Sequence, residues 1–567
     1  MPHAVTIATP GLQAIILCGP GSSFPTFTAN PDENPKALLP IANRPMVWYP
    51  LEFCYRAGIS NITIVCPPSA SQAIDTALKT NPFLTSLPFP RPDLLAPKDL
   101  DQNTGTAEIL RLPELQSLVT TDFVVLPCDL VCELGADKLV QAWMVKSASL
   151  ADLIQDTRTS QGTHHSGGLS VYYQTKTATP IKGEETDFMA SIPLPKNSSV
   201  LPAKGSLFPH LSKLVFSMPT DTLKDLLDEK KGFPVRHDLL EEYPRVKMVT
   251  SHRDAHIYIF PQWIMQFIKE NEHLETIGED VIGWWAKAGW QKGLATKLGL
   301  DEILRRPEGE KGDDHNGSTD TRKLHLEHKA TAEPTTVVTI QTPHPKDTDK
   351  NPLESHDEKN DPSLAVPPVL AYTHPSTPGA PIIRRVDTTQ LLLQISLQLA
   401  KLPSIEEVGS AEAASPFAHA RKVAYPEGVK PRTTIAKADS LVADNVTVQE
   451  KTSIKECVIG ANCQIGEGAK LSQCLLMDGV VIGKNCKLTK CVLGRRSELG
   501  EGCVLTDCEV QENLLVEPKT EAKEEKFMSS SGLEATKEEL DDAYNDEDDD
   551  DEEDRSVGDN SEEDDDF

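Results

Sequence analysis

The sequence has few of the features that mark membrane, secreted or nucleic-acid-binding proteins. No apolar run approaches the roughly 18–20 residues that a membrane-spanning helix needs, and the N-terminus lacks the basic and apolar regions of a signal peptide. Acidic residues outnumber basic ones by 86 to 56, so the chain lacks the positive surface that sequence-independent DNA or RNA binding requires. These absences predict a protein of the cytosol or nucleus without direct membrane or nucleic-acid contacts.

Zinc-type cysteine pairs and aromatic residues are also scarce. The twelve cysteines show none of the paired C-x-x-C spacing that is typical of zinc sites, so we expect free thiols in a reducing compartment. Aromatic residues make up 5% and hydrophobic residues 38% of the chain. With the 33 glycines added, the hydrophobic share is about 44%, still below the roughly 45–50%, glycine included, of a compact domain. Part of the chain is therefore expected to stay unfolded.

Two polar stretches are predicted to be these disordered parts. The insertion at 306–362 has little apolar periodicity and cannot bury enough surface to become ordered. The tail at 516–567 includes nine consecutive acids at 546–554, and like-charge repulsion keeps such a block extended. The tail is interpreted either as a solubilising segment or as a docking segment for a basic partner surface. Between them, 363–405 is expected to be a return segment that packs on the first domain.

The stretch 11–305 is predicted to form one α/β domain. Strand-like runs alternate with a helical pattern that ends at Gly58, which predicts βαβ units and a Rossmann-like, mostly parallel sheet. Ligands bind such sheets outside the carboxyl ends of the strands. Gly19 and Asp129 each follow a strand-like run, so both are candidate site residues. The runs are 12–17, 46–57 (helical), 61–66 and 123–126.

An internal repeat of 17 residues occupies 431–515. Apolar residues recur in three columns, and glycine and cysteine each form a further column. The columns are Val448, Ile465, Ile482, Leu499; Ile454, Leu471, Leu488, Leu505; Ile459, Leu476, Leu493, Val510; Gly466, Gly483, Gly500; and Cys457, Cys474, Cys491, Cys508. This spacing is typical of a hexapeptide β-helix with three short strands per coil. The cysteine column is interpreted as a stacked small residue, because no histidine or acidic column accompanies it as a metal array would require.

The turn after the first strand-like run contains Gly19, Gly21 and Ser22. Glycine allows backbone N–H groups to approach a phosphate closely. Lys36 follows in the segment Pro35-Lys-Ala-Leu-Leu-Pro-Ile-Ala-Asn-Arg-Pro45, ahead of the predicted helix. Together these features resemble the sugar-1-phosphate nucleotidyltransferase family. The resemblance implies a nucleotidyltransferase-like sheet domain followed by a left-handed hexapeptide β-helix, in the order observed here.

The family's catalytic pattern is incomplete in this sequence. Lys36 matches the family's phosphate-binding lysine and Asp129 its magnesium-binding aspartate. The triphosphate-binding arginine has no counterpart, the E-K-P motif appears as Phe216-Ser-Met-Pro219, and no W-x-D-x-G-T segment is found at 282–290. Nucleotidyl transfer depends on neutralising developing charge, so we expect no catalytic residue, no metal ligand and no cofactor. Gly19, Gly21, Ser22, Lys36 and Asp129 are interpreted as a vestigial nucleotide pocket.

Three segments are similar to the gamma subunits of the eukaryotic translation initiation factor 2B family. They are the shortened loop with Lys36–Pro50, Arg253-Asp-Ala-His-Ile-Tyr258, and Arg385-Val-Asp-Thr-Thr389. Epsilon subunits of the family add a C-terminal helical-repeat domain that carries the exchange activity, and nothing after Val516 is expected to form one.

The gamma-type resemblance implies a scaffolding, non-catalytic subunit of a guanine nucleotide exchange factor for initiation factor 2, in the cytoplasm and cytosol. The implied partners are the epsilon, alpha, beta and delta subunits and initiation factor 2 itself.

Two other functions remain as alternatives. Retention of Lys36 and Asp129 would suit an active sugar-1-phosphate nucleotidyltransferase with an unusual loop. An acyltransferase would need a catalytic histidine on a coil of the β-helix, and 431–515 contains none.

Several conspicuous side chains are interpreted as structural. His164 and His165 are expected in an exposed loop, His256 in a core or interface, and Trp284, Trp285 and Trp290 in helix packing.

Overall fold

The computed structural model describes most of the chain between residues 10 and 529. Residues outside the description are 1–9, 20–21, 101–102, 148–164, 177–180, 182–183, 195–204, 234, 306–364, 378, 412 and 530–567. The predicted insertion at 306–362 and the acidic run at 546–554 therefore lie outside the described residues. No helix within the described part is long and apolar enough to cross a membrane. The chain separates into two compact units: unit 1 comprises Met1–Gly19, Tyr49–Ser71 and Ser86–Arg385, and unit 2 comprises Pro20–Trp48, Gln72–Thr85 and Val386–Phe567.

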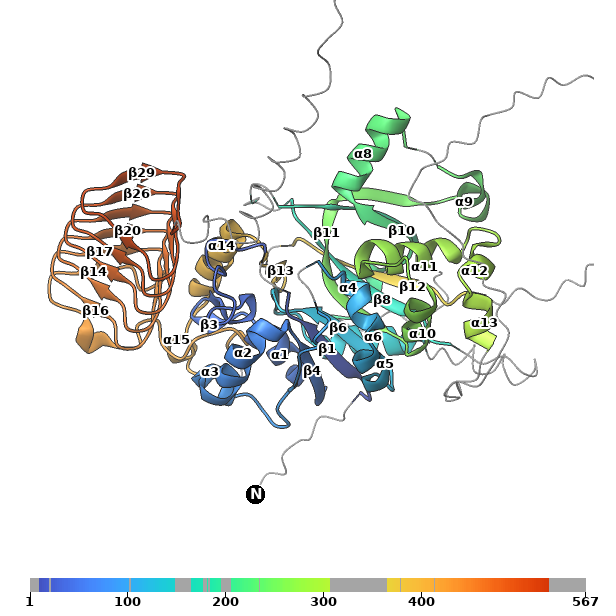
Figure 1. Cartoon of the computed structure of the whole chain (residues 1–567), viewed down its shortest axis with the longest axis horizontal. Coiled ribbons are helices and arrows are strands. Elements are labelled where there is room, and N and C mark those ends of the chain that lie inside the picture. Colours follow the sequence, from blue (N-terminus) through green and yellow to red (C-terminus); the bar gives the residue numbers. More distant parts are fainter. Residues whose placement is uncertain are drawn as a thin grey trace, which may run out of the picture. The chain divides into compact units, whose positions relative to one another are not determined.

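Unit 1 is built on a nine-stranded sheet with the order β5-β4-β1-β6-β11-β8-β12-β10-β9 (Figure 1). The neighbours β5, β4, β1 and β6 run parallel, as the sequence predicts, whereas β11 and β10 run antiparallel to their neighbours. The sheet is therefore mixed, and parallel where Gly19 and Asp129 follow their strands. The strands are β1 Gln13–Leu17, β4 Asn61–Val65, β5 Asp93–Leu95, β6 Phe123–Pro127, β8 Gly168–Gln174, β9 Asp187–Pro193, β10 Leu211–Pro219, β11 Lys247–Phe260 and β12 Val369–His374.

Five of these strands close on themselves. β9 pairs with β10 and also with the first half of the long strand β11. The strands β11, β8, β12, β10 and β9 thus form a ring of paired strands. Register shifts in β11 between Val249 and His252, and again between Asp254 and Tyr258, allow one strand to serve both the ring and the open sheet.

Helices of unit 1 contribute apolar side chains to the core around the sheet. Ile264, Phe267 and Ile268 of α10 are fully buried in this core with Trp285 of α11. The indole N–H groups of Trp285 and Trp290 donate to the carbonyls of Pro367 and Val215 at 2.8 Å each, so the predicted packing role of both is confirmed. Helices with at least part of their length in unit 1 are α1 Trp48–Arg56, α2 Pro68–Thr80, α4 Thr106–Arg111, α5 Pro113–Leu118, α6 Ala136–Ser147, α8 Thr220–Lys230, α9 His237–Glu242, α10 Trp263–Glu270, α11 Ile282–Ala288, α12 Leu294–Lys297 and α13 Leu300–Arg305.

Unit 2 contains the predicted β-helix, built from three parallel sheets of short strands (Figure 1). The first sheet has β14 Thr434–Ile435, β17 Ser453–Lys455, β20 Lys470–Ser472, β23 Lys487–Thr489, β26 Val504–Thr506 and β29 Glu521–Lys523. The second has β15 Leu441–Val442, β18 Val458–Ile459, β21 Leu475–Leu476, β24 Val492–Leu493, β27 Glu509–Val510 and β30 Lys526–Phe527. The third has β16 Thr447–Val448, β19 Gln464–Ile465, β22 Val481–Ile482, β25 Glu498–Leu499 and β28 Leu515–Val516.

The three apolar columns and the cysteine column all point into the β-helix core, as the 17-residue period predicts. All twelve cysteines of the chain are buried free thiols, as expected. The β-helix continues beyond the predicted end at 515, because β28, β29 and β30 add another coil that ends at Phe527. The first part of the predicted disordered tail is therefore structured.

The coil corners require left-handed backbone, which asparagine and glycine tolerate best. Residues with positive φ recur in three columns with the same period. They are Asn445, Asn462, Gly479, Arg496, Asn513; Lys451, Gly468, Asn485, Gly502, Lys519; and Glu456, Gln473, Lys490, Asp507, Glu524.

One face of the β-helix is apolar on its outside as well. The outward side chains Leu441, Val458, Leu475 and Val492 of the second sheet are buried, and α14 (Thr389–Ala400) packs on β18 and β21. The predicted return segment 363–405 is consequently divided at residue 385. Its first part enters unit 1 as β12 and β13 (Ile383–Arg385), whereas α14 belongs to unit 2. Smaller elements of the chain are η1 Lys36–Leu38, β2 Pro40–Ile41, β3 Arg44–Pro45, α3 Pro82–Thr85, β7 Leu130–Cys132, η2 Phe208–His210, η3 Ile277–Val281, α15 Ile405–Val408 and η4 Pro426–Gly428.

The glycine column of the β-helix leads to a first prediction. A Cβ at Gly483 would lie 2.7 Å from the backbone N of Glu501 and from the carbonyl of Gly500. Backbone atoms of the next coil cannot move aside individually, so Gly483→Ala is expected to destabilise the β-helix by about 1–3 kcal/mol. Hydrogen exchange followed by mass spectrometry, on peptides from 464–510, measures this as lost protection. Gly232→Ala is the control, because a Cβ there meets nothing within 4 Å; equal protection in both variants would contradict the prediction.

Candidate functional site

Gly19 and Asp129 lie at the carboxyl edge of the unit 1 sheet, where the sequence predicts ligand binding. Leu17 of β1 is paired with Pro127 of β6, and the Cys128 N–H donates to the Leu17 carbonyl at 3.0 Å. Both residues therefore follow neighbouring parallel strands at the same edge. Of the other predicted pocket residues, Gly21 lies outside the described residues, and Ser22 and Lys36 belong to unit 2.

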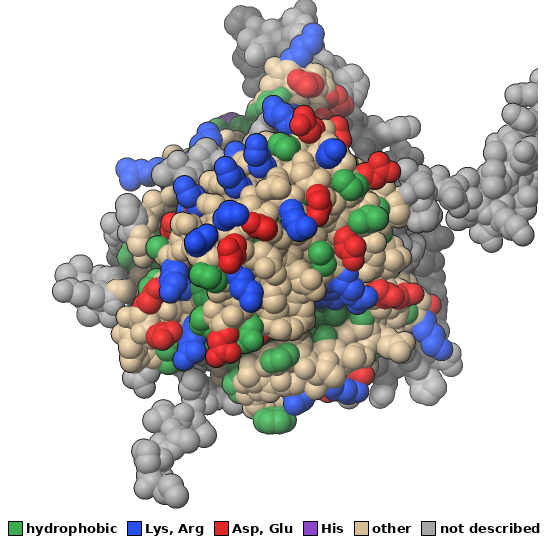
Figure 2. All heavy atoms as spheres, turned by 90° about the vertical axis from the view of Figure 1, so that its left-hand side faces the viewer, with side chains coloured by type: hydrophobic (Ala, Val, Ile, Leu, Met, Phe, Trp, Pro, Cys, Tyr) green, Lys and Arg blue, Asp and Glu red, His purple; other side chains and the backbone are tan. Residues whose placement is uncertain are grey.

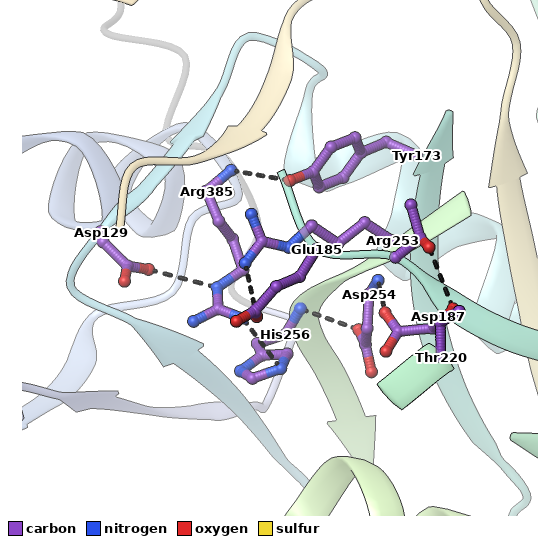
Figure 3. A network of polar contacts seen from close by, with 10 residues as sticks. Asp129, Tyr173, Glu185, Asp187, Thr220, Arg253, Asp254, His256 and Arg385 are labelled. Atoms are coloured by element: carbon purple, nitrogen blue, oxygen red, sulfur yellow. Dashed lines mark hydrogen bonds and ion pairs between the residues drawn. The ribbon is translucent and has the colours of Figure 1, made fainter. Parts of the chain in front are cut away.

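Asp129 is buried against a cation of the same chain. Its side chain is only 1% exposed, and its Oδ1 lies 3.5 Å from Nε of Arg385, whose side chain is 16% exposed (Figure 3). The local fold explains the pairing, because β13 runs antiparallel to β7 and places Arg385 opposite Leu130, the residue after Asp129. A buried carboxylate needs such a partner, since its uncompensated charge would cost several kcal/mol.

His256 lies on the other side of the Arg385 guanidinium. Nη1 of Arg385 is 3.1 Å from Nε2 of His256. Because a guanidinium only donates hydrogen bonds, Nε2 accepts, and the imidazole in this geometry is neutral with its proton on Nδ1. His256 has a left-handed backbone with φ of 52°. The Asp254 carboxylate supports this turn, because its Oδ1 accepts the His256 backbone N–H at 2.8 Å.

Two buried carboxylates follow in the same network. Oδ2 of Asp254 accepts the Tyr258 hydroxyl at 2.7 Å. Oδ2 of Asp187 accepts the Asp254 backbone N–H at 2.6 Å (Figure 3). Burial, together with the nearby charge of Asp187, raises the pKa of Asp254 to about 7. Burial likewise raises the pKa of Asp187, against the opposing effect of Arg253 and Arg385. Burial thus favours the neutral form of both carboxyl groups, and their hydrogen bonds fix the strands around Arg385.

The family implies a magnesium ion bound to the aspartate that Asp129 matches, and the residues around Asp129 do not fit one. A divalent cation requires several oxygen ligands. Here the Arg385 guanidinium lies beside the Asp129 carboxylate, where the magnesium ion would bind. A guanidinium is itself positively charged and offers no ligand atom to a metal ion. The described surroundings thus form a structural ion pair, and no reaction step is assigned to the metal.

The predicted phosphate-binding segment lies in unit 2. The Lys36 ammonium is 5.9 Å from the centroid of the Phe24 ring, within the range of a cation–π contact. The loop that holds Phe24 is joined to the β-helix, since the Thr26 hydroxyl donates to Oε2 of Glu509 at 2.8 Å. In this unit Lys36 is thus part of a loop that packs on the β-helix.

Asn43 and Arg44, in the motif that carries the family resemblance, serve the same packing. The Asn43 amide donates to the Ile459 carbonyl of the β-helix at 3.0 Å. The buried Arg44 guanidinium donates to the carbonyls of Phe417 and Ala418 at 2.8 Å each and lies over the Trp48 ring at 4.4 Å. A motif interpreted as phosphate-binding therefore also supplies hydrogen bonds that hold unit 2 together.

The interpretation of His256 as a core or interface histidine agrees with its position in the network. His165 donates from Nε2 to the Leu304 carbonyl at 2.8 Å, and His164 lies outside the described residues.

The sequence patterns do not predict Arg385, Asp254 and Asp187 as members of one cluster. Two of the three segments that carry the gamma-type resemblance, 253–258 and 385–389, were the available signal, because they supply Asp254, His256 and Arg385.

Comparison with known proteins places both units in context. A family model described as nucleotidyl transferase matches residues 15–163, and one described as the LbH (left-handed β-helix) domain of EIF2B subunit epsilon matches residues 425–529. The translation initiation factor eIF2B subunit gamma of Schizosaccharomyces pombe is 26% identical over 316 residues, which are 55% of this chain and 59% of that protein. The eIF2B subunit gamma of Caenorhabditis elegans is 22% identical over 272 residues, 48% of this chain and 57% of that protein.

An epsilon subunit is also similar over a shorter stretch. The eIF2B subunit epsilon of Schizosaccharomyces pombe is 28% identical over 130 residues, 23% of this chain and 18% of that protein. The chain thus spans less than two thirds of the length of the relatives it matches. By its two domains and its relatives, the chain is similar to the gamma subunits of eIF2B, with a nucleotidyltransferase-like domain followed by a left-handed β-helix.

Proposed function

We propose that the chain is a non-catalytic subunit of an eIF2B-type complex, which promotes exchange of GDP for GTP on initiation factor 2. The observation that carries the non-catalytic role is the ion pair between Asp129 and Arg385. The names of the gamma relatives support the membership in such a complex.

The chemistry of nucleotidyl transfer argues against catalysis at Asp129. The reaction depends on cations that neutralise the triphosphate and its leaving group. A magnesium ion at Asp129 would have to displace the guanidinium of Arg385 and expose a carboxylate that is 1% exposed. Arg385 is itself held by His256 and by the Tyr173 hydroxyl, which accepts the Arg385 backbone N–H at 3.4 Å. The cluster therefore favours a structural role.

The β-helix surface is suited to contacts with other proteins. Figure 2 shows basic and acidic side chains interspersed with hydrophobic ones on one face of the β-helix. Leu515 of β28 is 66% exposed on the outside of the β-helix. A non-obligate interface is about as apolar as the rest of a protein surface, so this mixed composition is compatible with partner contacts. Under this proposal the partners are the epsilon, alpha, beta and delta subunits and initiation factor 2.

Native mass spectrometry of the tagged full chain, isolated from its own cells, tests the proposal. Co-purification with an epsilon-type chain and three further subunit types is the expected result. The complex should also accelerate GDP release from initiation factor 2. Recovery of the chain alone or as a homo-oligomer would overturn the proposed function.

The match to the nucleotidyl transferase model keeps one alternative, an active sugar-1-phosphate nucleotidyltransferase. It is tested by pyrophosphate release from nucleoside triphosphates with a panel of sugar 1-phosphates and Mg²⁺. We expect release at the background rate. Release that disappears in Asp129→Asn would establish the alternative.

A further inference from the structure

The closed ring of strands in unit 1 has a cavity of about 640 Å³ at one end. Each of its five strands contributes a lining side chain: Gln174 of β8, Ser191 of β9, Ser212 of β10, Lys247 of β11 and His374 of β12. Gln174 and His374 are the last residues of the parallel neighbours β8 and β12. The cavity therefore lies at the mouth of a small barrel and at carboxyl strand ends, two places where ligand sites recur.

The charge of this mouth is opposite to that of the whole chain. The chain carries a net charge of −30, but none of the described residues that line the cavity is acidic. Two lining residues, Arg245 and Lys247, are exposed cations. Within the described residues, neither forms an ion pair with a carboxylate. A concave surface that carries exposed cations attracts anions.

Three histidines complete the lining, at positions 210, 252 and 374. The His374 ring is fixed, because its Nε2 donates to the Pro381 carbonyl at 2.8 Å and its Nδ1 lies 3.1 Å from the Tyr372 hydroxyl. His252 is buried and has the Ser251 hydroxyl 3.3 Å from its Nδ1. The positions of these rings in the wall are thus fixed before a ligand binds. Such preorganisation lowers the cost of binding.

We propose that this barrel mouth binds a small phosphorylated metabolite. Arg245 and Lys247 are assigned to the phosphate, since guanidinium and ammonium groups are the usual phosphate partners. Gln174, Ser191 and Ser212 provide amide and hydroxyl groups for a polar remainder such as a sugar. The volume falls within the roughly 300–1,000 Å³ of small-molecule sites. The site is distinct from the cluster around Asp129 and does not depend on the proposed function.

Isothermal titration calorimetry of the full chain at physiological salt tests the proposal, with glucose 6-phosphate, inorganic phosphate and glucose as probes. We expect glucose 6-phosphate and inorganic phosphate to bind, and glucose to give no heat of binding. The double variant Arg245→Ala/Lys247→Ala is expected to bind glucose 6-phosphate at least about tenfold more weakly, because it loses two charged hydrogen-bond partners. Both side chains are exposed, so the variant retains its fold, which the thermal unfolding midpoint verifies.

A matched variant separates a built site from general attraction of anions. Lys292→Ala/Lys297→Ala removes the same net charge from exposed positions on another part of unit 1 and should leave binding unchanged. In NMR spectra of protein labelled at the histidine rings, glucose 6-phosphate should shift the ring signals of His252 and His374. The ring signal of His273 should not move. Absence of binding at millimolar concentrations, or equal weakening in both double variants, would overturn the proposal.

Discussion

Arg385→Met is expected to destabilise unit 1 by about 3–5 kcal/mol, because it removes the guanidinium that faces the buried Asp129 carboxylate. Asp129 is 1% exposed and lies 3.5 Å from the guanidinium, so water cannot replace the lost charge. The substitution also removes the donor to His256. Chemical denaturation followed by tryptophan fluorescence measures the effect, since Trp143, Trp263, Trp284, Trp285 and Trp290 all report on unit 1.

The neighbouring residue provides a matched control for this prediction. Arg384 lies over the Tyr173 ring at 4.9 Å, and Arg384→Met should cost only about 0.5–2 kcal/mol. The double variant Asp129→Asn/Arg385→Met should recover part of the lost stability, because it carries no uncompensated charge. Equal effects of the two single substitutions would show that the ion pair does not stabilise the unit. A rise in wild-type stability with Mg²⁺ that Asp129→Asn abolishes would show that Asp129 binds the cation despite Arg385.

Asp254→Asn is expected to stabilise unit 1 at pH 8 by about 2–4 kcal/mol and to change its stability little at pH 4. The pKa of Asp254 is raised from 3.8 to about 7 by burial and by Asp187. The folded state therefore holds a proton that the unfolded state releases between these values. In the wild type this contribution is fully present below about pH 4 and is lost as pH rises through about 7. Asparagine stays neutral throughout and removes that slope.

Denaturant unfolding at pH 4, 6 and 8 measures the pH dependence. Asp228→Asn, at an exposed position of α8, is the control and should follow the wild-type curve. Destabilisation of Asp254→Asn by the same amount at every pH would contradict the prediction. It would mean that the Asp254 charge is needed, for example to balance Arg385, which lowers the Asp254 pKa in the same cluster.

The β-helix illustrates how far a repeat carries a sequence-based prediction. Each coil buries residues at a fixed interval, so the columns are visible in the chain without knowledge of any distant contact. The last coil was missed although Val516, Ala522 and Phe527 continue the same period. The many glutamates and lysines between them gave the segment the composition of a disordered tail. Periodicity is therefore the better guide to the end of this domain than local charge.

The site around Asp129 shows the opposite case. Gly19 and Asp129 were found because a residue that follows a buried parallel strand reaches the ligand edge by geometry alone. The partner of Asp129 is 256 positions away in the sequence, and only the pairing of β13 with β7 brings Arg385 to it. The same applies to His256, whose role depends on which side of a bulged strand it occupies.

The sequence alone thus determined the features that repeat or alternate locally: the three parallel strands β1, β4 and β6 with helix α1, the β-helix and its buried cysteine column. Local patterns suffice there because each element buries its own apolar face. Tertiary structure decided the rest. It paired Asp129 with a cation, joined α14 and the Lys36 loop to unit 2, and closed five strands into a ring with a positive cavity at one end. Those outcomes depend on charges and hydrogen bonds between distant segments, which meet only when the chain has folded.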